Sequence, residues 1–412
     1  MYATDEFVAR PSRFIQTALY EILEKEGEQM DKVYILLTKE AEENNFEDYY
    51  DEQNKTHLDG LKKVWKEHFP EHADKLIPVP MKSGQLESEQ WELFEQIYNL
   101  IEENDELYFD ITHSFRSNPV ITLIISNFAR TMKNAEIKRL FYGNFEALGP
   151  AYKVKEIPLE QRVAPIVDIT SMMELLDWTV AVDSFLRTGN PVQIKNLSEE
   201  KVKENKGDKD YIKIKQLSLQ LYNFSKILEM SRGLLVEKQL QTVFKTLKNV
   251  GTIENEKLPQ FSKLVDKMTE KLSPFSENEI ENMWEISKWC YDHGLYQQSI
   301  TFLSENIITN IAYKIGADVS DENIRMAISG ILSKKLSKEF NPEDFEKYAE
   351  LIDPIQSLLD QYEELKTYAK IAATRNDMNH AGNKGNYKSV DSIEPTIKEV
   401  LEQIKPFFKT DK

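Results

Sequence analysis

The first third of the chain alternates between two hydrophobic periods. Short runs rich in β-branched and aromatic residues, such as KVYILLT at 32–38 and ELYFDI at 106–111, predict buried strands. Longer stretches with apolar residues three and four positions apart predict amphipathic helices. The expected strands are 32–38, 77–81, 106–111 and 137–143, and the expected helices are 12–26, 88–104 and 118–132. Strands that alternate with helices indicate an α/β domain with a mostly parallel sheet.

Beyond residue 169 the pattern becomes helical and strand candidates almost disappear. The charged, apolar-poor run 198–210 predicts a mobile loop. We therefore expect an α/β domain at 1–165 and an all-α region at 166–412, joined near 155–170. The expected helices of the second region are 172–190, 211–241, 277–291, 296–314, 353–379 and 395–408.

Charge and cysteine content narrow the functional classes. The chain has 412 residues and a net charge of −18, whereas proteins that bind nucleic acid nonspecifically over a large surface are usually basic. Any RNA contact must therefore be local, and we expect no stable DNA binding. The single cysteine, Cys290, excludes an intrachain disulfide and a cysteine-based metal site. Neither a signal peptide nor an apolar span of 18 residues is present, so we expect a cytoplasmic protein without a membrane partner.

The stretch FDITHSFRSNP at 109–119 places hydrogen-bonding side chains where an expected strand ends and a helix begins. Ligands of parallel sheets bind outside the carboxyl ends of the strands, and a helix N-terminus attracts phosphate. Arg116 can hold a phosphate through two hydrogen bonds, and Asp110 can orient the loop. A capped strand–helix turn without a ligand explains the same pattern about equally well. The candidate ligand-binding residues are Thr112, His113, Ser114, Arg116 and Asn118, with Thr38 and Asn144 at neighbouring strand ends.

A second polar cluster closes the expected helix 353–379. Arg375, Asn376 and His380 lie in RNDMNH, and several lysines between 366 and 388 surround them with only one acid, Asp377. These residue types permit metal-free RNA cleavage, because the 2′-OH of RNA attacks the adjacent phosphate. His380 can move a proton near neutral pH, and Arg375 can stabilise charge in the transition state.

The spacing of Arg375 and His380 does not place them side by side on a regular helix. At 100° per residue, Arg375 and His380 lie about 140° apart on a straight helix. Either the helix is irregular at this point or a second copy of the chain completes the site. Because the pattern is so short, an exposed arginine and histidine at a solvated helix end are by themselves the more common explanation of it. The histidines of HFPEH at 68–72 have no second ligand cluster, so we expect no metal.

Taken together, the two clusters resemble a known family. DITHSFR is similar to the ligand-loop motif of CARF domains, the Rossmann-like sensors of CRISPR systems, and RNDMNH resembles the Arg-x(4–6)-His motif of HEPN ribonuclease domains. LLTKEAEENNF, FYGNFEA, PIVDIT and WCYDHGLYQQSITFLSE also look like blocks of this family and occur in the expected order. The chain therefore resembles the CARF–HEPN ancillary ribonucleases of type III CRISPR antiviral defence.

The resemblance implies a concrete function. Two CARF domains of a homodimer would form one pocket for cyclic oligoadenylate, the allosteric activator, and two HEPN domains would form one site for single-stranded RNA. Binding of the ring would activate metal-independent endoribonuclease cleavage without a cofactor. Cyclic tetra-adenylate is the favoured ring, with cyclic hexa-adenylate left open, as is slow cleavage of the ring itself. The alternative function is a non-catalytic, dimerising nucleotide sensor.

One feature departs from the family pattern. Members usually begin with a strand whose following loop also contacts the ligand, whereas this sequence opens MYATDEFVARPSRF and continues toward the first helix. We therefore expect the first strand to be missing, through a misplaced start, and the stability of the CARF domain to suffer.

Overall fold

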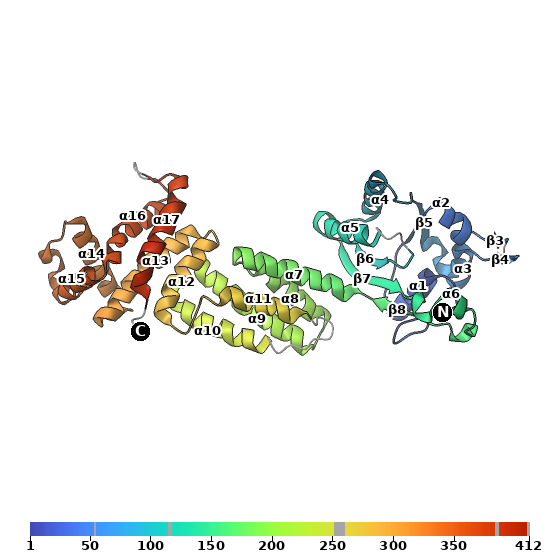
Figure 1. The fold of residues 1–412 in the computed structure, drawn as a ribbon, viewed down its shortest axis with the longest axis horizontal. Coiled ribbons are helices and arrows are strands. Elements are labelled where there is room, and N and C mark those ends of the chain that lie inside the picture. Colours follow the sequence, from blue (N-terminus) through green and yellow to red (C-terminus); the bar gives the residue numbers. More distant parts are fainter. Residues whose placement is uncertain (53–54, 114–117, 251–259, 384–386, 410–412) are drawn as a thin grey trace. The chain divides into compact units, whose positions relative to one another are not determined.

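The chain folds into two units, Met1–Glu174 and Leu175–Lys412. The computed structural model describes residues 1–412 except 53–54, 114–117, 251–259, 384–386 and 410–412. The described strands all lie in the first unit, and the described elements of the second unit are helices (Figure 1). The expected α/β plus all-α fold is thus confirmed. Among the described helices, none combines the length and the apolar character that a membrane crossing requires.

The first unit is built around a sheet of four strands in the order β1–β8–β7–β6. β6 runs parallel to β7, β8 runs antiparallel to β7, and β1 runs parallel to β8. β2 and β5 form a separate parallel pair, and β3 and β4 form an antiparallel hairpin. The strands are β1 (Tyr2–Ala3), β2 (Val33–Leu37), β3 (Tyr49–Asp51), β4 (Thr56–Leu58), β5 (Leu76–Pro80), β6 (Glu106–Asp110), β7 (Glu136–Gly143) and β8 (Ala164–Asp168).

Helices bury their apolar faces against these strands in several small clusters. Ile15 and Leu19 of α1 are buried together with Phe141 of β7 and Ile166 of β8. α4 and α5 share another cluster, which Leu107 of β6 also contacts. The helices are α1 (Ile15–Lys25), α2 (Lys39–Ala41), α3 (Leu61–His68), α4 (Glu87–Leu100), α5 (Asn118–Lys133) and α6 (Ala151–Val154), and α7 (Thr170–Thr188) leads into the second unit.

The four strands expected from sequence are confirmed as β2, β5, β6 and β7, but the sheet differs from the expected one. Tyr2 and Ala3 form β1, a strand of two residues that pairs with Ala164 and Pro165 of β8. The absence of the family's longer first strand stays a prediction, and β2 and β5 pair apart from the other strands. The N-terminal amine adds a hydrogen bond of 2.8 Å to the carbonyl of Arg162. β8 was not expected, and its antiparallel pairing with β7 makes the sheet mixed.

The second unit has two hydrophobic cores joined by α12 and α13. The first core collects apolar side chains from Trp178 to Phe302, and the second runs from Trp284 to Phe408. Two buried hydrogen bonds tie the C-terminal end to the second core: Trp284 Nε1 donates to the carbonyl of Leu401, and Asn310 Nδ2 donates to that of Phe407, each at 2.9 Å. α13 packs along α16 and so carries the second candidate site.

Three helix expectations in this unit are corrected. The run 198–210 is not a loop, because most of it belongs to helices that bury Ser198 and Ile194. The stretch 211–241 is two helices separated at Ser231, whose φ is +53°. The stretch 353–379 is also broken, by a 3-10 turn at Glu363–Thr367. The helices are α8 (Val192–Glu204), α9 (Lys209–Glu229), α10 (Gly233–Val250), α11 (Phe261–Leu272), α12 (Glu279–Asp292), α13 (Tyr296–Ile315), α14 (Glu322–Ser337), α15 (Ile352–Gln361), α16 (Tyr368–Asn379) and α17 (Val390–Ile404).

Candidate functional sites

The carboxyl end of β6 is tied to β7 by side chains. Oδ1 of Asp110 accepts hydrogen bonds from the amide of Thr112 at 2.9 Å and from its hydroxyl. The same hydroxyl oxygen accepts a 2.7 Å hydrogen bond from the amide of Gly143, the last residue of β7. The hydroxyl of Thr112 therefore both donates and accepts a hydrogen bond within the protein, and it links the ends of β6 and β7. Its contact with a ligand stays a prediction.

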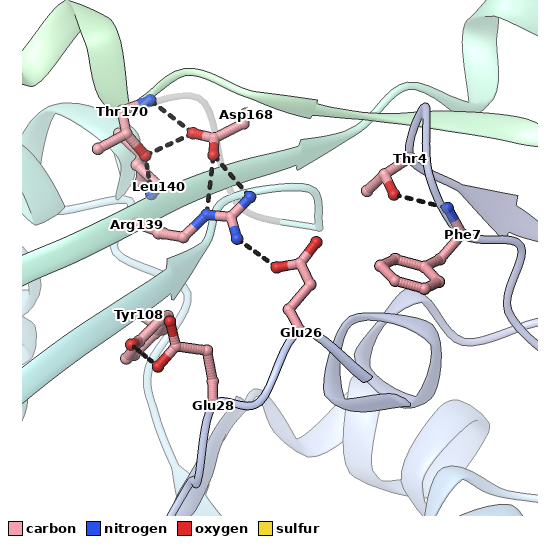
Figure 2. A network of polar contacts seen from close by, with 9 residues as sticks. All are labelled: Thr4, Phe7, Glu26, Glu28, Tyr108, Arg139, Leu140, Asp168 and Thr170. Carbon is pink, nitrogen blue, oxygen red and sulfur yellow. Dashed lines mark hydrogen bonds and ion pairs between the residues drawn. The ribbon is translucent and has the colours of Figure 1, made fainter. Parts of the chain in front are cut away.

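The same arrangement occurs a second time, at the end of β8. Asp168 accepts from the amide and the hydroxyl of Thr170, and the hydroxyl oxygen of Thr170 accepts from the amide of Leu140 in β7 (Figure 2). Both copies read Asp-Ile-Thr in the sequence, at 110–112 and 168–170. Threonine side chains after β6 and β8 therefore accept hydrogen bonds from β7 on both of its sides. The repeated Asp-Ile-Thr tripeptide could have indicated this from the sequence.

The two aspartates differ in the cations around them. Oδ2 of Asp168 accepts from Nε of Arg139 at 2.8 Å, and Arg139 also pairs with Glu26 after α1 (Figure 2). The described ion pairs include none for Asp110, and His113 is the one described ionisable side chain that influences its pKa. Desolvation raises the pKa of Asp110, opposed by its hydrogen bonds from Thr112 and by His113. Asp110 is nevertheless exposed to solvent.

The cluster at this sheet edge includes the first strand. Tyr2 is buried, and desolvation followed by the charges of Asp110 and Glu146 raises the pKa of its hydroxyl. The amide hydrogen of Glu146 and the hydroxyl of Tyr142 hold the pKa of the Glu146 carboxyl below its usual value, and His113 contributes in the same direction. Tyr2, Asp110, His113 and Glu146 are therefore electrostatic neighbours at one end of the sheet, which we call the sheet-edge site.

Gly143 allows β1 and α1 to approach this edge. A Cβ atom at this position would overlap Cδ1 of Ile15 and would lie 3.2 Å from Cε1 of Tyr2. The absence of a side chain, rather than an unusual backbone angle, is what the packing requires here. β1 thus contributes to the sheet-edge site although it has only two residues.

The remaining predicted ligand residues have different positions. Asn144 caps a 3-10 turn through a 3.1 Å hydrogen bond that its Oδ1 accepts from the amide of Ala147. Thr38 caps α2 in the same way, accepting from the amide of Ala41 at 3.2 Å, and its described contacts do not bring it to the sheet-edge site. Ser114 and Arg116 lie outside the described residues, and of Asn118 only its place as the first residue of α5 is described.

At the second site, Arg375 is directed toward α13. Its NH2 group pairs with Oε1 of Glu305 at 3.0 Å, and its NH1 group lies 3.5 Å from Oγ of Ser304. Nε of Arg375 is buried and has no hydrogen-bond partner among the described residues. Glu305 also pairs with Arg325 at 2.7 Å. Sequence reasoning missed Glu305 and Arg325, because nothing in the sequence indicates which acid meets Arg375.

Asn376 and His380 lie at the open end of α16. Both are exposed, and α16 remains regular to Asn379, so an irregular helix does not explain the Arg-x-x-x-x-His spacing. His380 closes the helix with its amide bonded to the carbonyl of Asn376, and Ala381 follows with φ +52°. Among the described contacts, none links Arg375 with His380. Asn379, which accepts from Gln297 at 3.2 Å, lies between these residues around the helix.

The expected positive patch around this site is weaker than its sequence suggested. Lys370 pairs with Glu399, and Lys366 pairs with Glu363 at 2.9 Å. Lys388 donates a 2.6 Å hydrogen bond to Oγ1 of Thr374, and its half-burial, with Lys370 nearby, lowers the pKa of its amine. Arg375 is paired as well, with Glu305, so Lys388 is the basic residue of this cluster that the described ion pairs do not include.

Comparisons with known proteins match both units. A family model described as the CARF domain of the CRISPR system endoribonuclease Csx1 matches residues 2–146, and a model described as the second domain of the CRISPR-associated protein MJ1674 matches residues 174–278. The CRISPR-associated protein MJ1674 of Methanocaldococcus jannaschii is 25% identical over 375 residues, which cover 88% of this chain and 52% of that protein. The chain therefore spans about half the length of this curated relative. The Csx1 match includes the sheet-edge site and every described strand of the first unit except β8.

Proposed function

We propose that the chain is an endoribonuclease of type III CRISPR defence, because its first unit matches the Csx1 CARF model and most of the chain is similar to a CRISPR-associated protein. In this proposal, cyclic oligoadenylate binds at the sheet-edge site and activates metal-independent cleavage of single-stranded RNA at the end of α16. The family relationship carries the proposal, and the two polar clusters assign its steps to residues.

The sheet-edge site supports the binding of a ring of adenylates. Its loop leads from β6 into α5, a helix of 16 residues whose N-terminus favours a phosphate. Arg116 would pair with a phosphate, and His113, which is exposed, would hydrogen-bond to the ring. Thr112 and Asn144 hold the edge in shape, since their side chains are bonded to the protein backbone. Cyclic tetra-adenylate is the ring that we favour.

The end of α16 supports transesterification within RNA. The 2′-OH attacks the adjacent phosphorus, the bond from phosphorus to the 5′-oxygen breaks, and a 2′,3′-cyclic phosphate and a 5′-OH result. His380 transfers a proton between these oxygens, and Arg375 stabilises the charge on the phosphate. Asn376 is exposed one turn before His380 and would hydrogen-bond to the same phosphate. The reaction needs no metal because the nucleophile belongs to the RNA.

A second copy of the chain is the partner that this chemistry favours. Arg375 and His380 do not meet within one chain among the described contacts, so a facing copy would supply the missing group. α5 supports such pairing, since its exposed apolar side chains recur along one stripe free of acidic residues. Two chains of net charge −18 repel each other, and an uncharged stripe avoids that repulsion. The stripe consists of Val120, Leu123, Ile124, Phe128 and Met132.

The proposal is tested by cleavage of a fluorescent single-stranded RNA in EDTA. The full chain is assayed alone and with cyclic tri-, tetra- or hexa-adenylate in turn. We expect one ring, the tetra-adenylate, to stimulate cleavage. Cleavage without any dependence on a ring would contradict the sensor half of the proposal. Binding of a ring with no cleavage under any condition would instead favour a non-catalytic, dimerising sensor.

A further inference from the structure

Glu305 of α13 joins two arginines through its two carboxylate oxygens. Oε1 pairs with Arg375 of α16 at 3.0 Å, and Oε2 pairs with Arg325 of α14 at 2.7 Å. The Glu305 side chain is 37% exposed, so water and a solute can reach the carboxylate. The three residues belong to the second unit and bring three helices together behind the candidate catalytic end of α16.

The two arginines are held with very different strength. Arg325 makes four hydrogen bonds: to the carboxylate and the carbonyl of Glu305, to Oγ1 of Thr309 at 2.8 Å and to the carbonyl of Val319 at 3.3 Å. Arg375 has the ion pair, a contact of 3.5 Å to Ser304 at the limit of a hydrogen bond, and a buried Nε without a described partner. Arg325 is therefore the fixed member and Arg375 the exchangeable one.

Because Arg325 is bound to Glu305 more firmly than Arg375 is, Arg375 can leave the carboxylate at a low cost in free energy. A partly buried carboxylate that loses its only cation becomes an uncompensated charge, which is strongly unfavourable. Glu305 avoids that state, because Arg325 remains paired with it when Arg375 turns away. Arg375, with two of its donors weakly used, gains by turning to a phosphate, which accepts two parallel hydrogen bonds from a guanidinium.

We infer that Glu305 and Arg325 are positioning residues that hold Arg375 ready and release it to a phosphate of the RNA. This inference rests on the proposed function for its substrate, but the network itself is a feature of the described contacts. Glu305 competes with RNA for Arg375, and Arg325 weakens that competition by sharing the carboxylate. The two positioning residues should therefore affect RNA binding in opposite directions when they are replaced.

The test measures binding of a fluorescent 2′-O-methyl RNA, which has no 2′-OH and is not cleaved. Fluorescence anisotropy is recorded for the full chain and for Glu305→Gln and Arg325→Gln, each also combined with Arg375→Gln. Glu305→Gln should tighten binding about fivefold, because it removes the competing charge, and Arg325→Gln should weaken binding about fivefold. Thermal unfolding of each variant shows that the compared proteins are folded.

The Arg375→Gln background separates this mechanism from a change of net charge. Both effects should vanish there, because the positioning residues act through Arg375. Equal effects in both backgrounds, effects of the same sign, or no binding by the wild-type chain would each overturn the inference. With cleavable RNA, Glu305→Gln should lower both KM and kcat, since the arginine binds more readily but is held less precisely.

The assay also distinguishes failure of the inference from failure of the proposed function. If the variants change binding of 2′-O-methyl RNA as expected while the chain cleaves no RNA with any of the cyclic oligoadenylates, the positioning network is present and the chain is not a ribonuclease. A chain that cleaves RNA but shows no coupling between Glu305 and Arg375 is a ribonuclease without it.

Discussion

Thr112 and His380 both follow a regular element and both carry a polar side chain, yet their surroundings are opposite. The hydroxyl of Thr112 donates to Asp110 and accepts from the amide of Gly143. His380 is exposed at the end of α16, and no described hydrogen bond uses its ring. In this protein the polar side chain after the strand links two strands of the sheet, whereas the one at the helix end is exposed and has no described partner for its ring. Each prediction below tests one side of this difference.

The largest expected effect is the loss of RNA cleavage when His380, at the end of α16, is replaced. His380→Ala should reduce RNA cleavage at least about a hundredfold, because proton transfer by a positioned side chain typically contributes that much or more. Its melting temperature should stay unchanged, since the side chain is exposed. His57→Ala replaces an exposed histidine of the first unit and is the matched control, with cleavage expected at the wild-type rate. Equal cleavage by both variants would remove His380 from the mechanism.

The next effect concerns the packing behind the sheet edge. Gly143→Val should lower the free energy of unfolding of the first unit by about 1–3 kcal/mol, because a side chain there overlaps Ile15. Calorimetry of the full chain should show one transition displaced to lower temperature. Gly233→Ala is the control: its Cβ would lie 3.7 Å from Phe302, an ordinary contact at the start of α10. A Gly143→Val chain as stable as wild type would mean that β1 and α1 do not pack as described.

The paired Asp-Ile-Thr ends allow a comparison within one sheet. Thr112→Val and Thr170→Val each remove a hydroxyl that accepts from a β7 amide, leaving that amide without its partner. Each should cost about 1–2 kcal/mol locally, seen as roughly tenfold faster hydrogen exchange at Gly143 and Leu140 respectively. Only Thr112→Val should also weaken ring binding, because only this end lies at the sheet-edge site. Unchanged hydrogen exchange in both variants would show that the threonine hydroxyls contribute little to the stability of β7.

A smaller effect is expected from pH. Desolvation raises the pKa of Asp110 in the folded chain, so the folded state binds this proton more tightly than the unfolded state does. The free energy of unfolding therefore falls as pH rises from the ordinary carboxyl value, about 4, through the raised value. Asp110→Asn keeps an oxygen that accepts from Thr112 and removes the titration. Its stability relative to wild type should rise with pH across this interval, and a relative stability that falls instead would reverse the sign.

The sequence predicted those parts of the fold that local patterns encode. Runs such as KVYILLT gave β2, while APIVD in β8 was missed because it is short, contains proline and pairs with β7 from the opposite direction. Helices 211–241 and 353–379 were expected to be continuous, but each is broken in the structure. Gly233, two positions after Ser231, was a signal for the first break that the sequence reading passed over, whereas no glycine or proline lies next to the second break at Tyr362.

The residue types of the candidate sites could be predicted from the sequence, but the residues that they contact could not. The residue types at 110–118 and 375–380 indicated the chemistry, yet their spacing said nothing about Glu305, which lies 70 positions before Arg375. The bonding of Thr112 to Gly143 likewise depends on the register of β6 and β7. Partners that meet only after the chain folds cannot be found from one sequence, whereas the repeated Asp-Ile-Thr could have been.

The most direct test of the account measures ring binding and RNA cleavage on the same preparations of the wild type, His113→Ala and His380→Ala. We expect His380→Ala to bind cyclic tetra-adenylate as tightly as wild type and to cleave no RNA. His113→Ala should bind the ring about tenfold more weakly and, once saturated with ring, should cleave at the wild-type rate. Loss of both properties in either variant would contradict the separation of a sensing sheet edge from a catalytic helix end.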